Sequence, residues 1–433
     1  MLLCVRLVNC GCQESEKPRV YLTWRFNHGY QRKEIMVPAL FQLLICRTCM
    51  FKFKKVQESS IQDCNGGGAI RPGALPSLFF VHIVLTAILV IFLTIRGLLS
   101  VRSHHFHPKK WYPPLLTATA CSGIVAFTWQ WITLCYPSRA IRSAFWLSPL
   151  LTCAVGILLV LIGSAASLAI GSIALVFALI QSLYACWVNP RFNYAIEVLS
   201  VSTAFPPAKT TVLVIIWILT SIIYSSFLVS GIGGATITGT GIDILFILLI
   251  LLSLIWSMQV MKNTLQVTVA RIKYLNFACG ADMDTRVALI DTIKHLMSSI
   301  FLGSTLVPIL TVGVYSKGFV QASKDTWETF RRVRLESLID SDLTGSFCFL
   351  SGIAGGAICT LVGGTWTLAV HKSYATEVSI YAFLIGYLMC RIAMAWPQAC
   401  VSAYYVAYAE NPQSLRFDPT IPVRIQELQR YGA

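Results

Sequence analysis

The sequence predicts an all-α polytopic membrane protein, a bundle of about 8–10 transmembrane helices. Composition is the first reason, since 56% of the 433 residues are hydrophobic, only 12% are charged and the mean hydropathy is +0.68. An ordinary soluble domain carries about twice that share of charge. The second reason is a set of long uncharged stretches. One of them, Leu343 to Val370, runs for 28 residues, whereas about 20 suffice to cross the hydrocarbon core of a bilayer.

The segment from Leu343 to Asn411 organises the rest of the chain. A second apolar run follows the first after the short connection HKSYATE, so the two runs predict a helical hairpin in the membrane. Gly352 and Gly356 lie four residues apart in the first run, a spacing that lets neighbouring helices approach closely. Arg391 lies near the middle of the second run, where an unpaired charge is costly. We expect Arg391 to face the protein interior and to tie spans together through helix carbonyls or an acidic partner.

Three parts are expected along the chain: a basic, poorly ordered cytoplasmic arm (1–77), the transmembrane domain (78–412) and a short cytoplasmic tail (413–433). Ser143 to Pro190 contains 48 consecutive uncharged residues. As a helix it would be about 72 Å long, more than twice the thickness of the hydrocarbon core, so a turn is expected near residues 163–166. The other predicted spans before Leu343 are 78–99, 114–135, one from Thr210, and 244–261.

The distribution of basic residues predicts the orientation of the bundle. The net charge is +15, and the basic residues lie mainly in the N-terminal arm and in the loops. Counting them loop by loop places the N-terminus and the C-terminus in the cytoplasm and Gly231 to Gly241 outside. The loop with Arg102, Lys109 and Lys110 favours the opposite orientation, but the counts in the other loops and in the N-terminal arm outweigh it. A single crossing at 299–320 would break this pattern, so that piece is expected to be re-entrant or interfacial, or a crossing has been lost.

The sequence lacks the motifs that are typical of several functional classes. Cys46 and Cys49 form a CxxC pair without a second pair or a histidine pair at zinc-binding spacing, so no metal site is expected. No nucleotide-binding loop or catalytic triad pattern occurs, so we expect neither an enzyme nor a cofactor. The positive charge is explained by cytoplasmic loops and a lipid surface, and no nucleic-acid partner is expected.

Four segments carry a resemblance to a known family: 252–270 (LSLIWSMQVMKNTLQVTVA), 295–310 (HLMSSIFLGSTLVPIL), 313–330 (GVYSKGFVQASKDTWETF) and 401–416 (VSAYYVAYAENPQSLR). In order and spacing the chain resembles the choline transporter-like family, which includes the yeast pH-nine-sensitive protein, and most closely its plant branch. The resemblance implies a multi-pass plasma-membrane or endomembrane protein that moves choline or a related solute by facilitated transport.

The chain departs from the family pattern at one position. Family members carry a longer stretch, with a cysteine-rich cytoplasmic segment, between the blocks that correspond here to 301–310 and 313–330, whereas Thr311 and Val312 alone join them in this chain. This departure favours the alternative function, a membrane scaffold or trafficking protein that has lost transport. The sequence does not indicate an oligomeric state.

Choline is a quaternary ammonium, which proteins recognise with aromatic faces. Trp256 lies mid-span in a segment that carries the resemblance and is the first candidate contact, followed by Trp396, Tyr404 and Tyr405. The alternative for the two tyrosines is an aromatic belt at the membrane interface. Three more tryptophans are expected to pack or to face lipid: Trp129, Trp131 and Trp217. Three acidic residues near span ends are expected to reach the headgroups: Asp243, Asp342 and Glu377.

Overall fold

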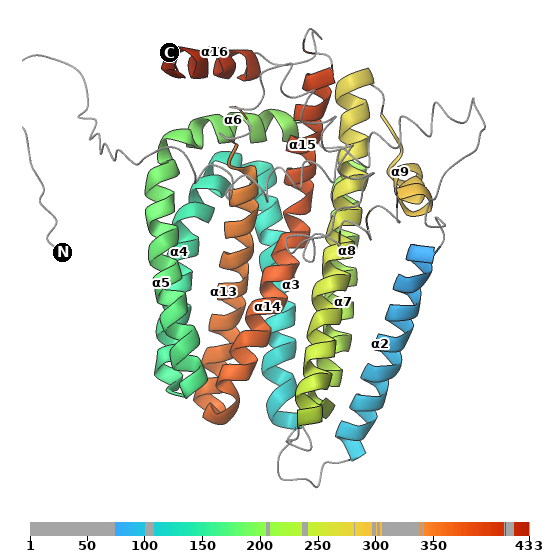
Figure 1. Cartoon of the computed structure of the whole chain (residues 1–433), viewed down its shortest axis with the longest axis vertical. Coiled ribbons are helices and arrows are strands. Elements are labelled where there is room, and N and C mark those ends of the chain that lie inside the picture. Colours follow the sequence, from blue (N-terminus) through green and yellow to red (C-terminus); the bar gives the residue numbers. More distant parts are fainter. Residues whose placement is uncertain are drawn as a thin grey trace, which may run out of the picture. The chain divides into compact units, whose positions relative to one another are not determined.

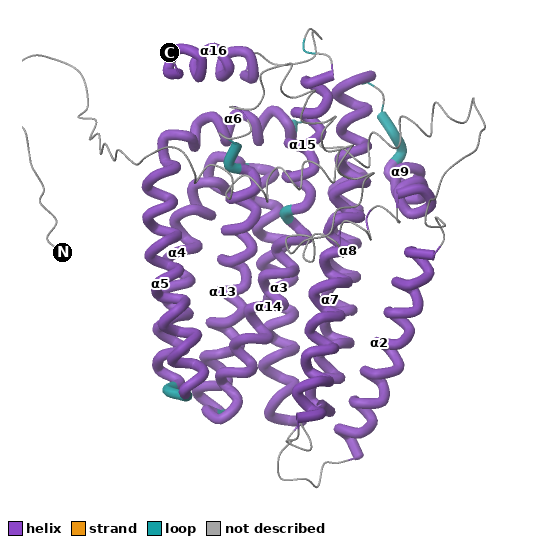
Figure 2. Tube along the Cα trace, viewed as in Figure 1, coloured by secondary structure: helices purple, strands orange, loops and turns teal. Residues whose placement is uncertain are grey.

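The computed structural model describes residues 74–99, 108–204, 208–235, 241–280, 282–296, 342–410 and 420–432, together with the single positions 300, 304, 338 and 412. Within these ranges the regular structure is entirely helical, as Figure 2 shows. The predicted all-α class is therefore confirmed. Residues 1–73, most of the predicted N-terminal arm, lie outside the described ranges, and the first helix begins at Ala74.

Most of the long helices lie side by side (Figure 1). In chain order the helices are α2 (Ala74–Leu99), α3 (Pro108–Cys135), α4 (Pro137–Ile162), α5 (Ala165–Val188), α6 (Phe192–Thr203), α7 (Ala208–Ala235), α8 (Gly241–Cys279), α9 (Thr285–Asp291), α13 (Thr344–Val370), α14 (Ala375–Ala393), α15 (Ala395–Glu410) and α16 (Thr420–Gly432). Eight segments in the described part of the chain are long and apolar enough to cross a membrane. The chain is thus an integral, multi-pass membrane protein.

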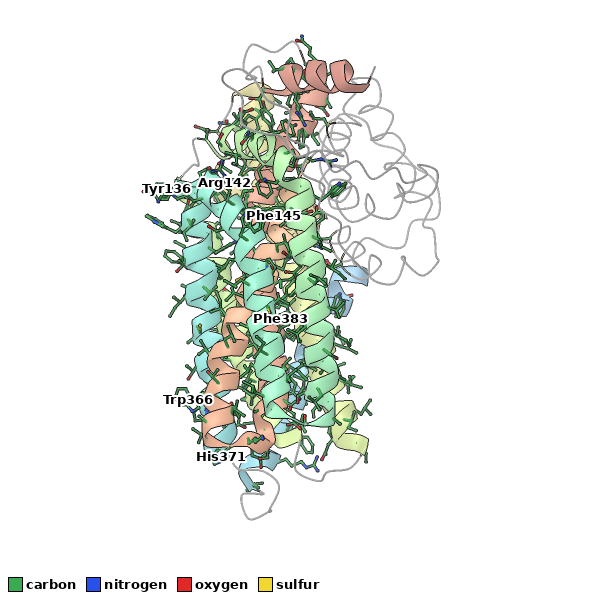
Figure 3. All side chains as sticks on the ribbon, turned by 90° about the vertical axis from the view of Figure 1, so that its left-hand side faces the viewer. Tyr136, Arg142, Phe145, Trp366, His371 and Phe383 are labelled. Atoms are coloured by element: carbon green, nitrogen blue, oxygen red, sulfur yellow. The ribbon has the colours of Figure 1, made fainter. Side chains whose placement is uncertain are left out.

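Successive spans run in opposite directions, so the connections gather at two ends of the bundle (Figure 1). One end carries α6 and α16, and we call it the α16 end. The other carries the turn at His371 between α13 and α14, and we call it the His371 end. Figure 3 shows the same separation, with Tyr136 and Arg142 toward the α16 end and Trp366 and His371 at the opposite end.

The predicted hairpin is present and forms the centre of the bundle. In α13, 78% of the span is buried, and in the span Lys372–Glu410 the share is 72%. The span in α2 is only 22% buried, and its large apolar side chains such as Phe80, Leu85 and Phe92 face outward. These contrasting fractions place α13 to α15 inside and α2 against lipid. The second predicted run is two helices, because α14 ends and α15 begins on either side of Met394.

The predicted turn after α4 is confirmed and has a clear local cause. Gly163 has a φ of 76°, in the left-handed region that glycine adopts without steric cost. Ser164 then caps α5, since its side chain accepts a hydrogen bond from the backbone N–H of Ser167 while the Ser167 hydroxyl accepts one from the backbone of Ser164. This capping box satisfies donors that the first turn of a helix leaves open.

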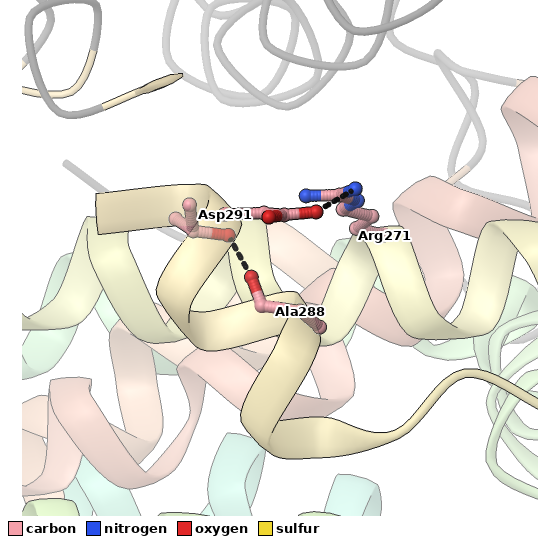
Figure 4. Close-up of polar contacts among 4 residues, drawn as sticks. Arg271, Ala288 and Asp291 are labelled. Carbon is pink, nitrogen blue, oxygen red and sulfur yellow. Dashed lines mark hydrogen bonds and ion pairs between the residues drawn. The ribbon is translucent and has the colours of Figure 1, made fainter. Parts of the chain in front are cut away.

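Helix α8 is longer than any expected span. It has 39 residues, about 58 Å as a helix, against about 30 Å of hydrocarbon. Its final part follows the predicted span 244–261 without interruption and is held by α9. Arg271 donates to the carboxylate of Asp291 at 2.7 Å, and the hydroxyl of Thr292 donates to the carbonyl of Ala288, which orders the same turn (Figure 4).

The long described helices that flank residues 299–320 are α8 and α13. Helix α8 ends and α13 begins at the α16 end of the bundle (Figure 1). The two long helices that flank this piece thus meet the same end of the bundle, and the expectation of a re-entrant or interfacial piece, or of a lost crossing, stays a prediction. Most of residues 299–320 and the join at Thr311 and Val312 lie outside the described ranges.

The orientation across the membrane is open to a direct test. We expect residues 236–240 outside the cell and the C-terminal tail inside, because basic residues concentrate in the loops of the α16 end. Single cysteines replace Thr236 and Ser414 in a background without native cysteines, and intact cells are treated with a membrane-impermeant thiol reagent. The expected result is labelling of Thr236→Cys and none of Ser414→Cys. Labelling of the second variant alone would mean that the bundle is inserted the other way.

Candidate functional site

Trp256 lies in an aromatic group between α2 and α8. Its ring centroid is 4.5 Å from that of His82 and 5.7 Å from that of Phe79, and both contacts are edge-on. Phe79 and His82 also stack on one another at 6.4 Å. We call Phe79, His82 and Trp256 the α2–α8 aromatic group. Its three rings come from two helices that are far apart in the sequence, so it exists only in the folded bundle.

Hydroxyl groups surround the polar side of this aromatic group. The hydroxyl of Ser253 shares hydrogen bonds with His82 Nε2 at 3.0 Å, with Thr86 at 3.1 Å and with Tyr224 at 3.3 Å. Tyr224 also donates to the hydroxyl of Ser257 at 2.9 Å, which brings in α7. In contrast, the indole N–H of Trp256 is buried without a hydrogen-bond partner among the described residues. The group therefore combines aromatic faces with a polar rim and contains neither lysine nor arginine.

Trp396 lies in a different environment, in the first turn of α15, and is 0% exposed. The helix breaks at Met394, two residues earlier, and Pro397 has no N–H to donate to the carbonyl of Ala393. A cation lies beside the break, because Arg391 is in the last turn of α14. Arg391 also interacts electrostatically with Lys262 of α8, which is only 2% exposed. A site beside the Arg391 cation is unfavourable for a cationic solute.

Tyr404 and Tyr405 are buried in the described bundle, with 1% and 0% of their surfaces exposed. The hydroxyl of Tyr405 is 3.1 Å from that of Tyr194 on α6, and the ring of Tyr404 meets Phe277 of α8 edge-on at 5.4 Å. This burial rules out the interface-belt alternative for these two residues. We call Tyr194, Phe277, Tyr404 and Tyr405 the tyrosine cluster.

Two of the chain's own cations lie on the tyrosine cluster. The ammonium of Lys273 is 5.7 Å from the ring centroid of Phe277 and donates a hydrogen bond to the carbonyl of Ala204 at 3.0 Å. The guanidinium of Arg424, in α16, lies 5.3 Å from the ring centroid of Tyr194. Both distances are within the roughly 6 Å over which a ring attracts a cation. The cluster thus has the chemistry of a cation site and holds internal cations in this conformation.

The predicted substrate contacts therefore separate into two places. Trp256 belongs to the α2–α8 aromatic group, while Trp396, Tyr404 and Tyr405 belong to the main core around α15. Sequence reasoning missed four aromatic partners, namely Phe79, His82, Tyr194 and Phe277. Only His82 had a visible signal, since it is a lone histidine inside an apolar span. The other three are common core residues whose partners depend on helix packing.

The predicted packing face of α13 lies against α14. A Cβ placed on Gly356 would come 2.8 Å from the carbonyl oxygen of Phe383, and one on Gly352 would come 3.0 Å from Cδ of Arg391. The stem of Arg391 thus rests on Gly352, and the backbone of α14 approaches α13 at Gly356. The absence of side chains at the two glycines permits both contacts.

The three tryptophans that were expected to pack or to face lipid do so. Trp129 is 7% exposed and belongs to the core, Trp131 is 56% exposed on the outside of α3, and the Trp217 indole donates to the carbonyl of Met261 at 2.9 Å. These side chains join helices or cover the lipid-facing surface.

The acidic residues near span ends behave differently from one another. Glu377 is exposed, as expected for a side chain that reaches the headgroups. Asp243 is not, because it is 4% exposed and forms an ion pair with Arg96 at 4.0 Å, which corrects the expectation. The Asp342 carboxylate accepts hydrogen bonds from the N–H and hydroxyl of Thr344 at the start of α13. Burial raises the pKa of Asp342, and these hydrogen bonds oppose that shift.

Comparison with known proteins places the centre of the bundle in a family. Residues 309–413, which include α13, α14 and α15, match the family described as plasma-membrane choline transporter. The chain is also similar to protein pns1 of Aspergillus fumigatus, with 24% identity over 108 residues. It has the same identity over 112 residues to protein PNS1 of Cryptococcus neoformans. Each match covers 24% of this chain and 20% of the relative.

The matched region falls on the most buried helices and leaves Trp256 outside it. It contains the quoted segment 313–330 and most of 401–416, two of the four segments that carry the resemblance. The plant branch stays a prediction, since the two relatives are fungal. The chain is thus similar to the choline transporter-like family over residues 309–413, about a quarter of its length.

Proposed function

We propose that this protein is a solute carrier that moves choline, or a related quaternary ammonium, across the membrane by facilitated diffusion. The observation that carries the proposal is the α2–α8 aromatic group, where Trp256, Phe79 and His82 meet beside a rim of hydroxyls. A trimethylammonium group donates no conventional hydrogen bond and is held by aromatic faces, each contributing about 0.5–2 kcal/mol. The family description, which names choline, supports the same substrate class.

The aromatic group suits such a cation better than the region of Trp396 does. Trp256 contacts the rings of Phe79 and His82, and His82 in turn bonds the hydroxyl of Ser253, whereas the break beside Trp396 follows the cationic Arg391. We infer that the imidazole of His82, 4.5 Å from the indole, holds the place that a bound ammonium takes. Neutral imidazole is displaced from an aromatic face at much lower electrostatic cost than a buried lysine.

The alternative function is a membrane scaffold or trafficking protein that retains the bundle and does not transport. It is supported by the direct join at Thr311 and Val312, where family members carry a longer segment. The two functions differ in what they require of the aromatic group. A carrier needs Trp256 for solute binding, whereas a scaffold needs only that the bundle fold and reach its membrane.

Choline uptake distinguishes the two functions. The chain is expressed in a host that lacks high-affinity choline transport, surface protein is quantified, and uptake of radiolabelled choline is measured without an imposed ion gradient. Saturable uptake above that of the empty host is expected. A second variant carries a family-length segment between Leu310 and Gly313, so that an effect of the short join is measured directly. Absence of uptake by both surface-expressed forms would contradict the carrier and favour the scaffold.

A further inference from the structure

The C-terminal helix α16 is docked on the bundle through one face. Ile421 is 0% exposed and belongs to the main core, and Ile425 packs against that core from the next turn of the helix. Val423 is 50% exposed and Gln426 is also exposed, so they lie on the other side. The helix lies next to α6 at the α16 end of the bundle (Figure 1).

The same face carries Arg424 onto the tyrosine cluster. Residues three and four apart share a helix face, so Arg424 and Ile425 flank the position of Ile421 on that face. Its guanidinium is 5.3 Å from the ring centroid of Tyr194. The ring is held from the other side, because the Tyr194 hydroxyl is 3.1 Å from that of Tyr405 in α15. The contact therefore joins the C-terminal tail to a helix at the centre of the bundle.

The identity of this occupant indicates what the tyrosine cluster can bind. A guanidinium is a delocalised and weakly hydrated cation, which is attracted to aromatic faces by cation–π interaction, as quaternary ammonium ions are. Behind Tyr194 the cluster continues inward through Tyr405 and Tyr404, both buried. Aromatic surface thus extends from the docked helix α16 to α15, which lies in the family-matched region.

We propose that Tyr194 and Tyr405 form a second organic-cation site, at the α16 end of the bundle, and that Arg424 is its resident ligand. An organic cation competes with Arg424 for the Tyr194 ring, and its binding releases α16. The tail helix is then a plug that holds this end closed when no cation is present. The site itself does not depend on the proposed function. Only the choice of choline as the organic cation that binds there would rest on it.

Hydrogen exchange of the purified full-length protein measures the docking of α16 directly. Loss of one cation–π contact is expected to shift the balance between docked and released α16 about 5-fold. Arg424→Gln should therefore raise exchange in residues 420–432, and Arg424→Lys should raise it less because a charge remains. Gln426→Ala changes an exposed residue of the same helix and serves as the control, which should exchange like the parent. If residues 420–432 exchange equally fast in Arg424→Gln and in the parent, the contact of Arg424 with Tyr194 does not hold α16 on the bundle.

A simple organic cation tests whether the contact is a site or only a tether. Tetramethylammonium chloride added to the parent protein should raise exchange in residues 420–432, while sodium chloride at equal ionic strength should not. Arg424→Gln should respond much less to tetramethylammonium, since it has no cation on the Tyr194 ring for the salt to displace. Equal effects of the two salts on the parent would overturn the cation site. Tyr194→Phe keeps the ring and should retain the response, whereas Tyr194→Leu should lose it, and an unchanged melting temperature shows that each variant is folded.

The test is independent of transport. Trp256→Leu removes the proposed transport contact and should leave the exchange of α16 and its response to tetramethylammonium unchanged. If the parent shows no choline uptake and α16 still responds, the carrier function fails and the second site stands. If uptake is normal and α16 does not respond, the second site fails alone.

Discussion

Gly356→Ala should destabilise the bundle more than Gly352→Ala or Gly363→Ala does in the same helix. The new Cβ would lie 2.8 Å from the carbonyl oxygen of Phe383, a backbone atom that cannot rotate away. Overpacking of this kind costs about 1–3 kcal/mol, and the better helix propensity of alanine recovers roughly 1 kcal/mol at most. The expected result is a melting temperature several degrees lower in detergent, measured by intrinsic fluorescence. The double variant with leucine at Gly352 and Gly356 should fail to accumulate as folded protein.

The same helix supplies matched controls for this prediction. A Cβ on Gly363 would meet Ala118 Cβ and Ala382 Cβ at 3.4 Å, an ordinary contact, so Gly363→Ala should melt at or above the parent temperature. Gly352→Ala should fall between the two, because its nearest neighbour is the flexible stem of Arg391 at 3.0 Å. If all three alanine variants melt alike, the close approach of α13 and α14 at Gly356 does not limit stability.

Trp256→Leu should weaken choline transport much more than Trp256→Phe. Leucine has no aromatic face, whereas phenylalanine keeps one, and a desolvated cation–π contact is worth about 1–2 kcal/mol. This loss corresponds to a half-saturation concentration roughly 5- to 30-fold higher. The measurement is the concentration dependence of radiolabelled choline uptake, normalised to surface protein. The difference should appear in the half-saturation concentration before it appears in the maximal rate.

Packing has to be separated from binding in this experiment. Trp256 also contacts Phe79 at 5.7 Å, so its truncation can loosen α2. Trp131→Leu is the control, since Trp131 is 56% exposed on the outer surface and contributes no described ring to either aromatic site. If the leucine and phenylalanine variants at position 256 have the same half-saturation concentration for choline uptake, Trp256 is not part of the solute site.

The path of the chain through the membrane could be predicted from local composition. The 48 uncharged residues from Ser143 to Pro190 required two crossings, and glycine followed by serine at 163 and 164 indicated where the turn falls. The glycine spacing in the 343–370 run predicted close packing without naming the partner. Lipid-facing composition constrains span number strongly, because few sequences other than apolar helices can cross.

The candidate sites could be predicted only in part, because their partners come from distant segments. Trp256 was visible as an aromatic residue inside a span, but its contacts with Phe79 and His82 depend on α2 packing beside α8. The break at Met394 was also missed, since the run around Arg391 and Pro397 remains apolar enough to cross as one helix. The tail helix α16 was not anticipated, because only its folded position brings Ile421 and Arg424 onto one face.

Because α8 is long and uninterrupted, a small tilt around one residue moves the end of the helix sideways. Phe277 of the tyrosine cluster lies 21 residues beyond Trp256, or about 32 Å along the axis. If the helix stays straight, a tilt of about 5° around Trp256 carries Phe277 sideways by about 3 Å. Such a displacement is a substantial part of the 5.4 Å between the ring centroids of Phe277 and Tyr404. A small rotation at the aromatic group in mid-membrane would therefore open or tighten the contacts at the α16 end with no hinge in between.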